Sequence, residues 1–101
     1  MKEKLKAVFT KFEMGENWCE GLVGDFFFQA KSFDVGSDFG INGGRVSKLA
    51  IKRKETVGNG RDWFEGVVVN YDRGWDIEPT AEVKAEYDAV MELLENAPPR
   101  F

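Results

Sequence analysis

The sequence of 101 residues contains no histidine and one cysteine, Cys19. Without histidine, the chain lacks the most common general base, the usual catalytic triads and most catalytic zinc sites. A single cysteine cannot form an intrachain disulfide, and no imidazole is present to activate its thiol as a nucleophile. We therefore predict a non-enzymatic protein without a metal ion or a cofactor, in the reducing environment of the cytoplasm.

Long apolar runs are also missing. No stretch approaches the roughly 18 apolar residues of a membrane span, and no apolar segment follows the charged residues 1–4 as it would in a signal peptide. We expect no membrane association. The apolar content of 43% and the aromatic content of 14% are typical of a folded protein, and 101 residues fit a single domain, 1–101.

The chain does contain a repeated pattern. The segment Asn-Trp-Cys-Glu-Gly-Leu-Val at 17–23 returns in outline at 62–68 as Asp-Trp-Phe-Glu-Gly-Val-Val. Residues two apart in a strand share one face, so both copies are predicted to be amphipathic strands. After the first copy, a two-residue loop at 24–25 fixes the register of a hairpin with a strand at 26–33. The core side of this hairpin is predicted to pair Val23 with Phe26, Gly21 with Phe28 and Cys19 with Ala30.

The second copy is expected to have the same orientation as the first. Its core-facing residues would be Phe64, Gly66 and Val68. The opposite face of the sheet would carry Trp63 and Glu65 together with Trp18 and Glu20.

The remaining elements follow from the spacing of apolar and turn-forming residues. Further strands are predicted at 4–14, 46–54, 62–71 and 75–77, with a turn at 58–60. Thr80 is expected to cap a helix at about 81–96, whose apolar stripe consists of Val83, Tyr87, Val90, Met91 and Leu94. We predict an α+β fold: an antiparallel sheet of five to six strands over about 4–77, with one C-terminal helix packed on its core face.

The segment Asn-Tyr-Asp-Arg-Gly-Trp-Asp at 70–76 has the densest mixture of aromatic and hydrogen-bonding side chains. Trp, Tyr and Arg are the residues that most often anchor protein interfaces. We therefore predict a surface that binds a partner protein, formed by Trp18, Phe39, Asn42, Arg45, Tyr71, Asp72, Arg73 and Trp75. A purely structural turn is the alternative, with Arg73 paired to Asp76. A homodimer through a face or an edge of the sheet also remains open.

A basic segment provides an alternative function. Positions 45–54 carry five basic residues and no acidic one, a composition that suits contacts with nucleic-acid phosphates: Arg45, Lys48, Lys52, Arg53 and Lys54. Lys48 and Lys52 share one face of the predicted strand, and the arginines share the other, which divides the basic surface. The net charge of −4 favours a protein partner over a nucleic acid.

Two further features carry weaker chemical signals. The motif Gly-Ile-Asn-Gly-Gly-Arg at 40–45 resembles an anion-binding nest, but a strand and not a helix is predicted after it, so a turn that needs positive φ is the favoured explanation of its glycines. Glu20 and Glu65 would form the carboxylate pair of a small hydrolase if their strands adjoin. The alternative for both glutamates is a solvated position on a strand.

Several of these motifs also resemble one protein family. They are Trp-x-Glu-Gly at 18–21, Phe-Gln-Ala-Lys at 28–31, the segment 37–49 and Asn-Tyr-Asp-Arg-Gly-Trp-Asp-Ile-Glu-Pro at 70–79. In this order they resemble a family of short uncharacterised proteins, with a domain of unknown function, from Gram-positive bacteria and their phages. The resemblance covers most of 17–95. It implies a phage or mobile-element accessory protein and assigns no activity and no functional residues.

Overall fold

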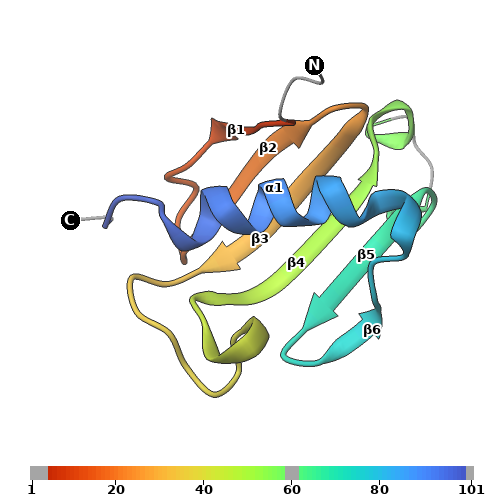
Figure 1. Ribbon diagram of the computed structural model, residues 1–101. Helices are drawn as coiled ribbons and strands as arrows, with labels where there is room; N and C mark the ends of the chain where they lie inside the picture. The colour runs from red at the N-terminus through yellow and green to blue at the C-terminus, as the bar shows by residue number, and fades with distance from the viewer. Residues whose placement is uncertain (1–4, 59–61, 100–101) are drawn as a thin grey trace.

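The structure is a computed structural model that describes residues 5–58 and 62–99 (Figure 1). Six antiparallel strands form one sheet in the order β1-β2-β3-β4-β5-β6, and helix α1 (Lys84–Glu95) lies across one face of it. The strands are β1 (Ala7–Lys11), β2 (Trp18–Val23), β3 (Phe26–Ser32), β4 (Val46–Arg53), β5 (Val67–Asp72) and β6 (Trp75–Ile77). The predicted α+β fold with a C-terminal helix is confirmed.

The hairpin of β2 and β3 has the predicted register. Val23 pairs with Phe26, Gly21 with Phe28 and Cys19 with Ala30 across the two-residue turn. Gly24 has φ +55°, which glycine adopts at little cost. A Cβ atom on Gly21 would lie 2.4 Å from the Phe28 ring and 2.1 Å from the Val8 carbonyl oxygen. Phe28 therefore covers the bare backbone of Gly21, and this close contact requires glycine.

The core lies between α1 and the inner face of the sheet. The helix contributes the predicted stripe, with Val83, Tyr87, Val90 and Leu94 buried, Met91 partly buried, and Ala89 buried in addition. The sheet contributes alternate residues of its central strands, which share one face because strand side chains alternate: Val23, Phe28, Ala30, Leu49, Ile51 and Val69. In the described part of the chain, no helix has both the length and the apolar composition that a membrane span requires.

Most of the second copy of the repeated pattern is not a strand, so the prediction is wrong for residues 62–66. Residues 62–66 form a turn, and β5 begins only at Val67. The Asp62 side chain accepts a hydrogen bond from the Phe64 N–H at 2.9 Å, and the Asp62 carbonyl accepts one from the Glu65 N–H at 3.0 Å. Such local bonds offer the backbone an alternative to a sheet ladder. Phe64 is consequently 60% exposed instead of facing the core.

Smaller differences concern the ends of elements. β1 is shorter than the predicted strand at 4–14. The first residue of that predicted strand and most of the predicted turn at 58–60 lie outside the described residues. Thr80 does not cap the helix with its side chain; its carbonyl accepts the Val83 N–H at 3.1 Å and opens a 3-10 turn, Ala81–Val83, ahead of α1.

Candidate functional site

The glycine-rich motif at 40–45 forms a turn, in which the Gly43 and Gly44 N–H groups donate to the Gly40 and Ile41 carbonyls at 3.0 and 2.9 Å, and its last residue meets a carboxylate of the protein itself. The Glu95 carboxylate, at the end of α1, accepts the Arg45 backbone N–H at 2.9 and 3.1 Å. A Cβ atom on Gly44 would lie 2.4 Å from this carboxylate, so glycine permits the approach. Asn42 is exposed and takes the left-handed conformation, with φ +54°. The motif therefore fixes the helix end to the loop.

Arg45 strengthens the same junction with its side chain. Its guanidinium donates to the carbonyl oxygens of Phe33 (2.7 Å), Glu95 (2.8 Å) and Ala97 (3.0 Å). A cation at the C-terminus of a helix satisfies carbonyls that lack intrahelical partners and interacts favourably with the helix dipole. The guanidinium of Arg45 is thus engaged within the fold and is not available to a partner.

Two predicted site residues, Tyr71 and Trp75, belong to an aromatic cluster beside the helix. Tyr71 is buried, and its hydroxyl donates to the Phe39 carbonyl at 2.9 Å. The Trp75 ring lies between Tyr71 and Tyr87, with centroid distances of 5.0 and 5.8 Å. Burial raises the pKa of the Tyr87 hydroxyl, and the charge of Asp88 raises it further. This cluster holds the loop that carries Phe39 in place.

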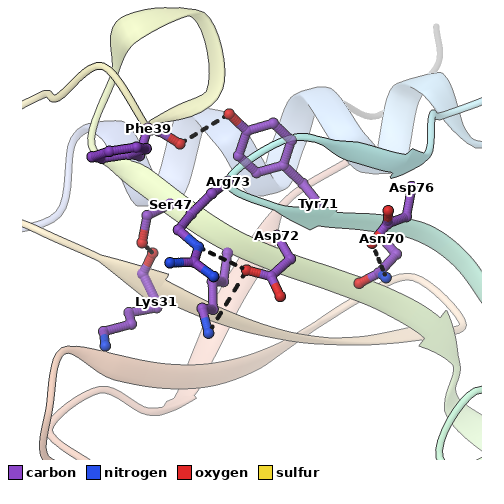
Figure 2. A network of polar contacts seen from close by, with 9 residues as sticks. Lys31, Phe39, Ser47, Asn70, Tyr71, Asp72, Arg73 and Asp76 are labelled. Carbon is purple, nitrogen blue, oxygen red and sulfur yellow. Dashed lines mark hydrogen bonds and ion pairs between the residues drawn. The ribbon is translucent and has the colours of Figure 1, made fainter.

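The turn between β5 and β6 presents Asp72 and Arg73 to solvent (Figure 2). Arg73 has φ +56°, and its N–H donates to the Ser47 carbonyl at 3.0 Å. The Asp72 carboxylate lies 3.3 Å from Arg73 Nε and 3.7 Å from Lys48 Nζ. The expected pairing of Arg73 with Asp76 is wrong, since Asp76 accepts from Asn70 instead. These exposed contacts orient the side chains and contribute little stability.

An apolar groove with a basic rim opens beside this turn. We call it the basic corner; its volume is about 460 Å³, and its main lining residues are Lys31, Phe33, Val35, Phe39, Lys48 and Arg73. Val35 is 74% exposed and Phe39 is 61% exposed, which is unusual for large apolar side chains that lie close together. Figure 2 shows Phe39, Arg73 and Lys31 arranged around Ser47. The corner thus combines exposed apolar side chains with three cations.

A second, smaller hollow of about 180 Å³ adjoins the basic corner on the uncovered face of the sheet. Its lining includes Trp18, Trp63 and Asp72, and Lys48 lines both hollows. Lys48 Nζ lies 5.9 Å from the centre of the Trp18 ring, within range of a cation–π interaction. Trp63 does share this face with Trp18, as predicted, although it reaches the face from a turn.

The basic segment is less accessible than its sequence indicates. Lys48 and Lys52 share the outer face of β4, as predicted. Lys52 is only 2% exposed, and its ammonium group donates to the Trp63 carbonyl at 2.7 Å beneath the Trp63 ring, 4.5 Å from the ring centre. A phosphate cannot reach this ammonium while Trp63 covers it.

The proposed carboxylate pair does not form, because the strands of its two glutamates do not adjoin. β3 and β4 separate β2 from β5, which places those strands about 14 Å apart at the usual strand spacing. Glycoside cleavage uses carboxyl groups roughly 5–10 Å apart. Glu20 accepts a hydrogen bond from Gln29 at 3.0 Å, and Glu65 lies exposed in the turn before β5. Among the described residues, no cluster of three or more potential metal ligands occurs.

Of the predicted site residues, Phe39 and Arg73 line the basic corner, and Trp18, Tyr71 and Asp72 line the adjoining hollow. Asn42, Arg45 and Trp75 line neither. Sequence reasoning did not select Lys31 or Val35. The available signal was an apolar residue, Val35, within the long irregular segment 34–44, because an apolar side chain in a glycine-rich loop has little local structure to cover it.

The fold and the site define a small α+β protein with one open sheet face and an exposed groove at its corner. A family model described as "Domain of unknown function (DUF7678)" matches residues 17–95, so the chain belongs to this family. No curated protein and no solved structure matches the chain. The resemblance to a domain of unknown function is therefore confirmed, and membership brings no activity with it.

Proposed function

We propose that this protein is a non-enzymatic binding protein that docks an acidic, partly apolar segment of a partner protein in the basic corner. The observation that carries the proposal is the exposure of Val35 and Phe39 beside three cations, Lys31, Lys48 and Arg73. Apolar anchors surrounded by charged groups are typical of protein-binding surfaces.

Charge supports an acidic partner. The chain has a net charge of −4, yet the described residues that line the corner include three cations and no carboxylate; Asp72, which lies beside Arg73 and Lys48, offsets only part of this charge. Such a local reversal of charge attracts carboxylates and fixes the orientation of a partner as it docks. Lys31 Nζ lies 5.9 Å from the Phe33 ring, so its ammonium group is held at the rim of the groove.

The cellular location and the origin of the protein are part of the same proposal. We place the protein in the cytoplasm of a bacterium or of a phage-infected bacterial cell, as an accessory protein. The support is the sequence resemblance together with the cysteine content: the one cysteine, Cys19, is fully buried in the core, and a chain with a single cysteine does not use the intrachain disulfides that are typical of oxidising compartments.

Nucleic-acid binding, the alternative, has less support. Of the five cations at 45–54, Lys52 is covered by Trp63 and Arg45 is bonded to the end of α1. Lys48 lies near Asp72, which offsets part of its charge. The remaining exposed cations are Arg53, the last residue of β4, and Lys54, directly after it; both lie at the opposite end of the strand from Lys48 and form no continuous basic surface with it.

A displayed library of random peptides, selected on the full chain, tests the proposal. We expect enriched sequences that combine aspartate or glutamate with an aromatic or aliphatic residue. The double variant Phe39→Ala/Arg73→Glu should weaken the best peptide at least about tenfold. Lys54→Glu makes the same change of charge at an exposed cation outside the corner and should change the affinity less than about twofold.

Two results would contradict the proposal. One is a set of selected peptides without acidic enrichment that bind the double variant as well as the wild type. The other is binding of single- or double-stranded nucleic-acid probes that falls steeply with salt and is lost in the double variant, which would assign the corner to phosphates.

A further inference from the structure

The edge of the sheet formed by β1 is open to a further strand. β1 is the first strand in the sheet order, and in the described part of the chain only β2 pairs with it. An edge strand presents unpaired N–H and C=O groups at every second residue. Val8 and Thr10 are exposed, β-branched residues well suited to a strand with a further neighbour. Its protection against pairing is confined to its end, where a bulge lies between Phe9 and Lys11 and the Lys11 side chain is exposed, so the part from Ala7 to Phe9 stays open to a neighbour.

The opposite edge is protected. β6 has only three residues, Trp75–Ile77, and Pro79 follows two positions later. Short edge strands and nearby prolines discourage strand addition. Of the two edges, β1 is therefore the one that can accept another strand.

A groove runs beside this edge, between β1 and α1. Its volume is about 510 Å³. Apolar side chains of β1, of α1 and of the residues next to them line most of it: Leu5, Ala7, Phe9, Ala89, Leu93 and Ala97. Figure 1 shows β1 at the margin of the sheet, next to the face that α1 crosses. A strand added to β1 would direct every second side chain toward this groove.

We propose that β1 and α1 form a binding site for an extended segment of a partner protein, which adds to the sheet as a further strand and inserts apolar side chains into the groove. Strand addition of this kind supplies affinity through main-chain hydrogen bonds and specificity through pockets for alternate side chains. A helix cannot occupy the site in the same way, because its backbone groups are already paired and cannot satisfy the edge of β1.

Charge disfavours a second copy of the chain as the occupant. Antiparallel pairing of β1 with itself would bring the two α1 helices side by side across a twofold axis. Apart from Glu95, which is bonded to Arg45, the helix carries Glu86, Asp88 and Glu92 against Lys84 alone, and Glu92 lines the groove itself. Like charges at such an interface are destabilising. A partner strand without an acidic helix avoids this repulsion.

The site uses none of the residues of the basic corner, so it is independent of the function proposed above. A displayed library of peptides with apolar residues at alternate positions, selected on the full chain, provides the probe. We expect binders whose affinity falls at least about tenfold when the peptide is N-methylated at alternate residues in one register, and changes little in the other register. Only a strand that bonds to an edge shows this alternation.

Variants locate the site. Leu93→Glu places a charge at the groove and should weaken the selected peptide at least about tenfold, whereas Ile77→Glu, on the opposite edge, should change the affinity less than about twofold. The Phe39→Ala/Arg73→Glu variant should bind this peptide with unchanged affinity. This result distinguishes a failure of strand addition at β1 from a failure of docking in the basic corner. Failure to select a binder, indifference to N-methylation, or dimerisation of the wild type that Leu93→Glu abolishes would each overturn the proposal.

Discussion

Segments 17–23 and 62–68 share one order of residue types and adopt different structures. The first contains β2, in which Cys19 is fully buried and Gly21 lies beneath Phe28. The second is a turn followed by the start of β5, and Phe64, at the position equivalent to Cys19, is 60% exposed. A shared pattern of apolar and polar residues was therefore insufficient to specify a strand.

The first residue of each copy accounts for much of the difference. Asn17 donates its side-chain amide to the Ser32 carbonyl at 3.1 Å, and its own carbonyl accepts the Ser32 N–H at 3.0 Å, which ties the start of β2 to the end of β3. Asp62 has no side-chain donor, and its carboxylate accepts the nearby Phe64 N–H. A long-range bond extends the sheet in one copy, and a local bond closes a turn in the other.

The glycine of the first copy should show the largest effect on stability. Gly21→Ala would place a Cβ atom 2.1 Å from the Val8 carbonyl oxygen and 2.4 Å from the Phe28 ring. We expect a loss of about 3 kcal/mol in the free energy of unfolding, measured by urea denaturation. Gly74→Ala is the control, since nothing lies within 4 Å of its added Cβ. Equal losses in both variants would contradict the close contact.

Substitution of the glycine of the second copy, Gly66, should also lower the free energy of unfolding, but for a different reason. Gly66 has φ +78°, and an added Cβ would lie 2.7 Å from the Thr56 side chain. We expect Gly66→Ala to cost about 2 kcal/mol. Gly58 has φ +74° with nothing within 4 Å, so Gly58→Ala measures the backbone strain alone and should cost about 1 kcal/mol. If Gly66→Ala costs no more than Gly58→Ala, the contact with Thr56 is unimportant.

Exchanging the first residues tests the explanation itself. Asn17→Asp removes the donor to the Ser32 carbonyl and should cost about 1.5 kcal/mol, because a partly buried acceptor loses its partner. Asp62→Asn keeps an acceptor oxygen for the Phe64 N–H and should change the free energy of unfolding by less than about 0.5 kcal/mol. The reverse order of these two effects, in the same urea titrations, would refute this account of the two copies.

The smallest effect is expected at Phe64. Its side chain is 60% exposed, so Phe64→Ala should cost less than about 0.5 kcal/mol. A loss of several kcal/mol in thermal or urea unfolding would mean that Phe64 packs in the core, as a strand at this position requires.

The parts of the fold that the sequence predicted depend on short-range rules. The two-residue turn at 24–25 set the register of β2 and β3, and a helical stripe identified the buried face of α1. The second copy was predicted wrongly because alternation was read without the Asp62 side chain, which bonds to the backbone two residues ahead. The alternation of apolar and polar residues alone does not distinguish a strand from such a turn.

The candidate site was predictable only in part. Phe39 and Arg73 follow from the preference of interfaces for aromatic and arginine side chains. The roles of Arg45 and Tyr71 depend on contacts with Glu95 and Phe39, residues 50 and 32 positions away in the sequence. No local pattern reveals which of these side chains the fold has already engaged, so the sequence could not separate them from the residues that stay available.

The most direct test of the proposed function is an NMR titration of the ¹⁵N-labelled chain with the strongest acidic peptide selected on it. The proposal predicts that chemical-shift changes concentrate at residues 31–39, 47–48 and 72–74, which form and support the basic corner. Changes confined to residues 5–9 and 89–97, or to the basic segment after residue 50, with the corner unaffected, would contradict it.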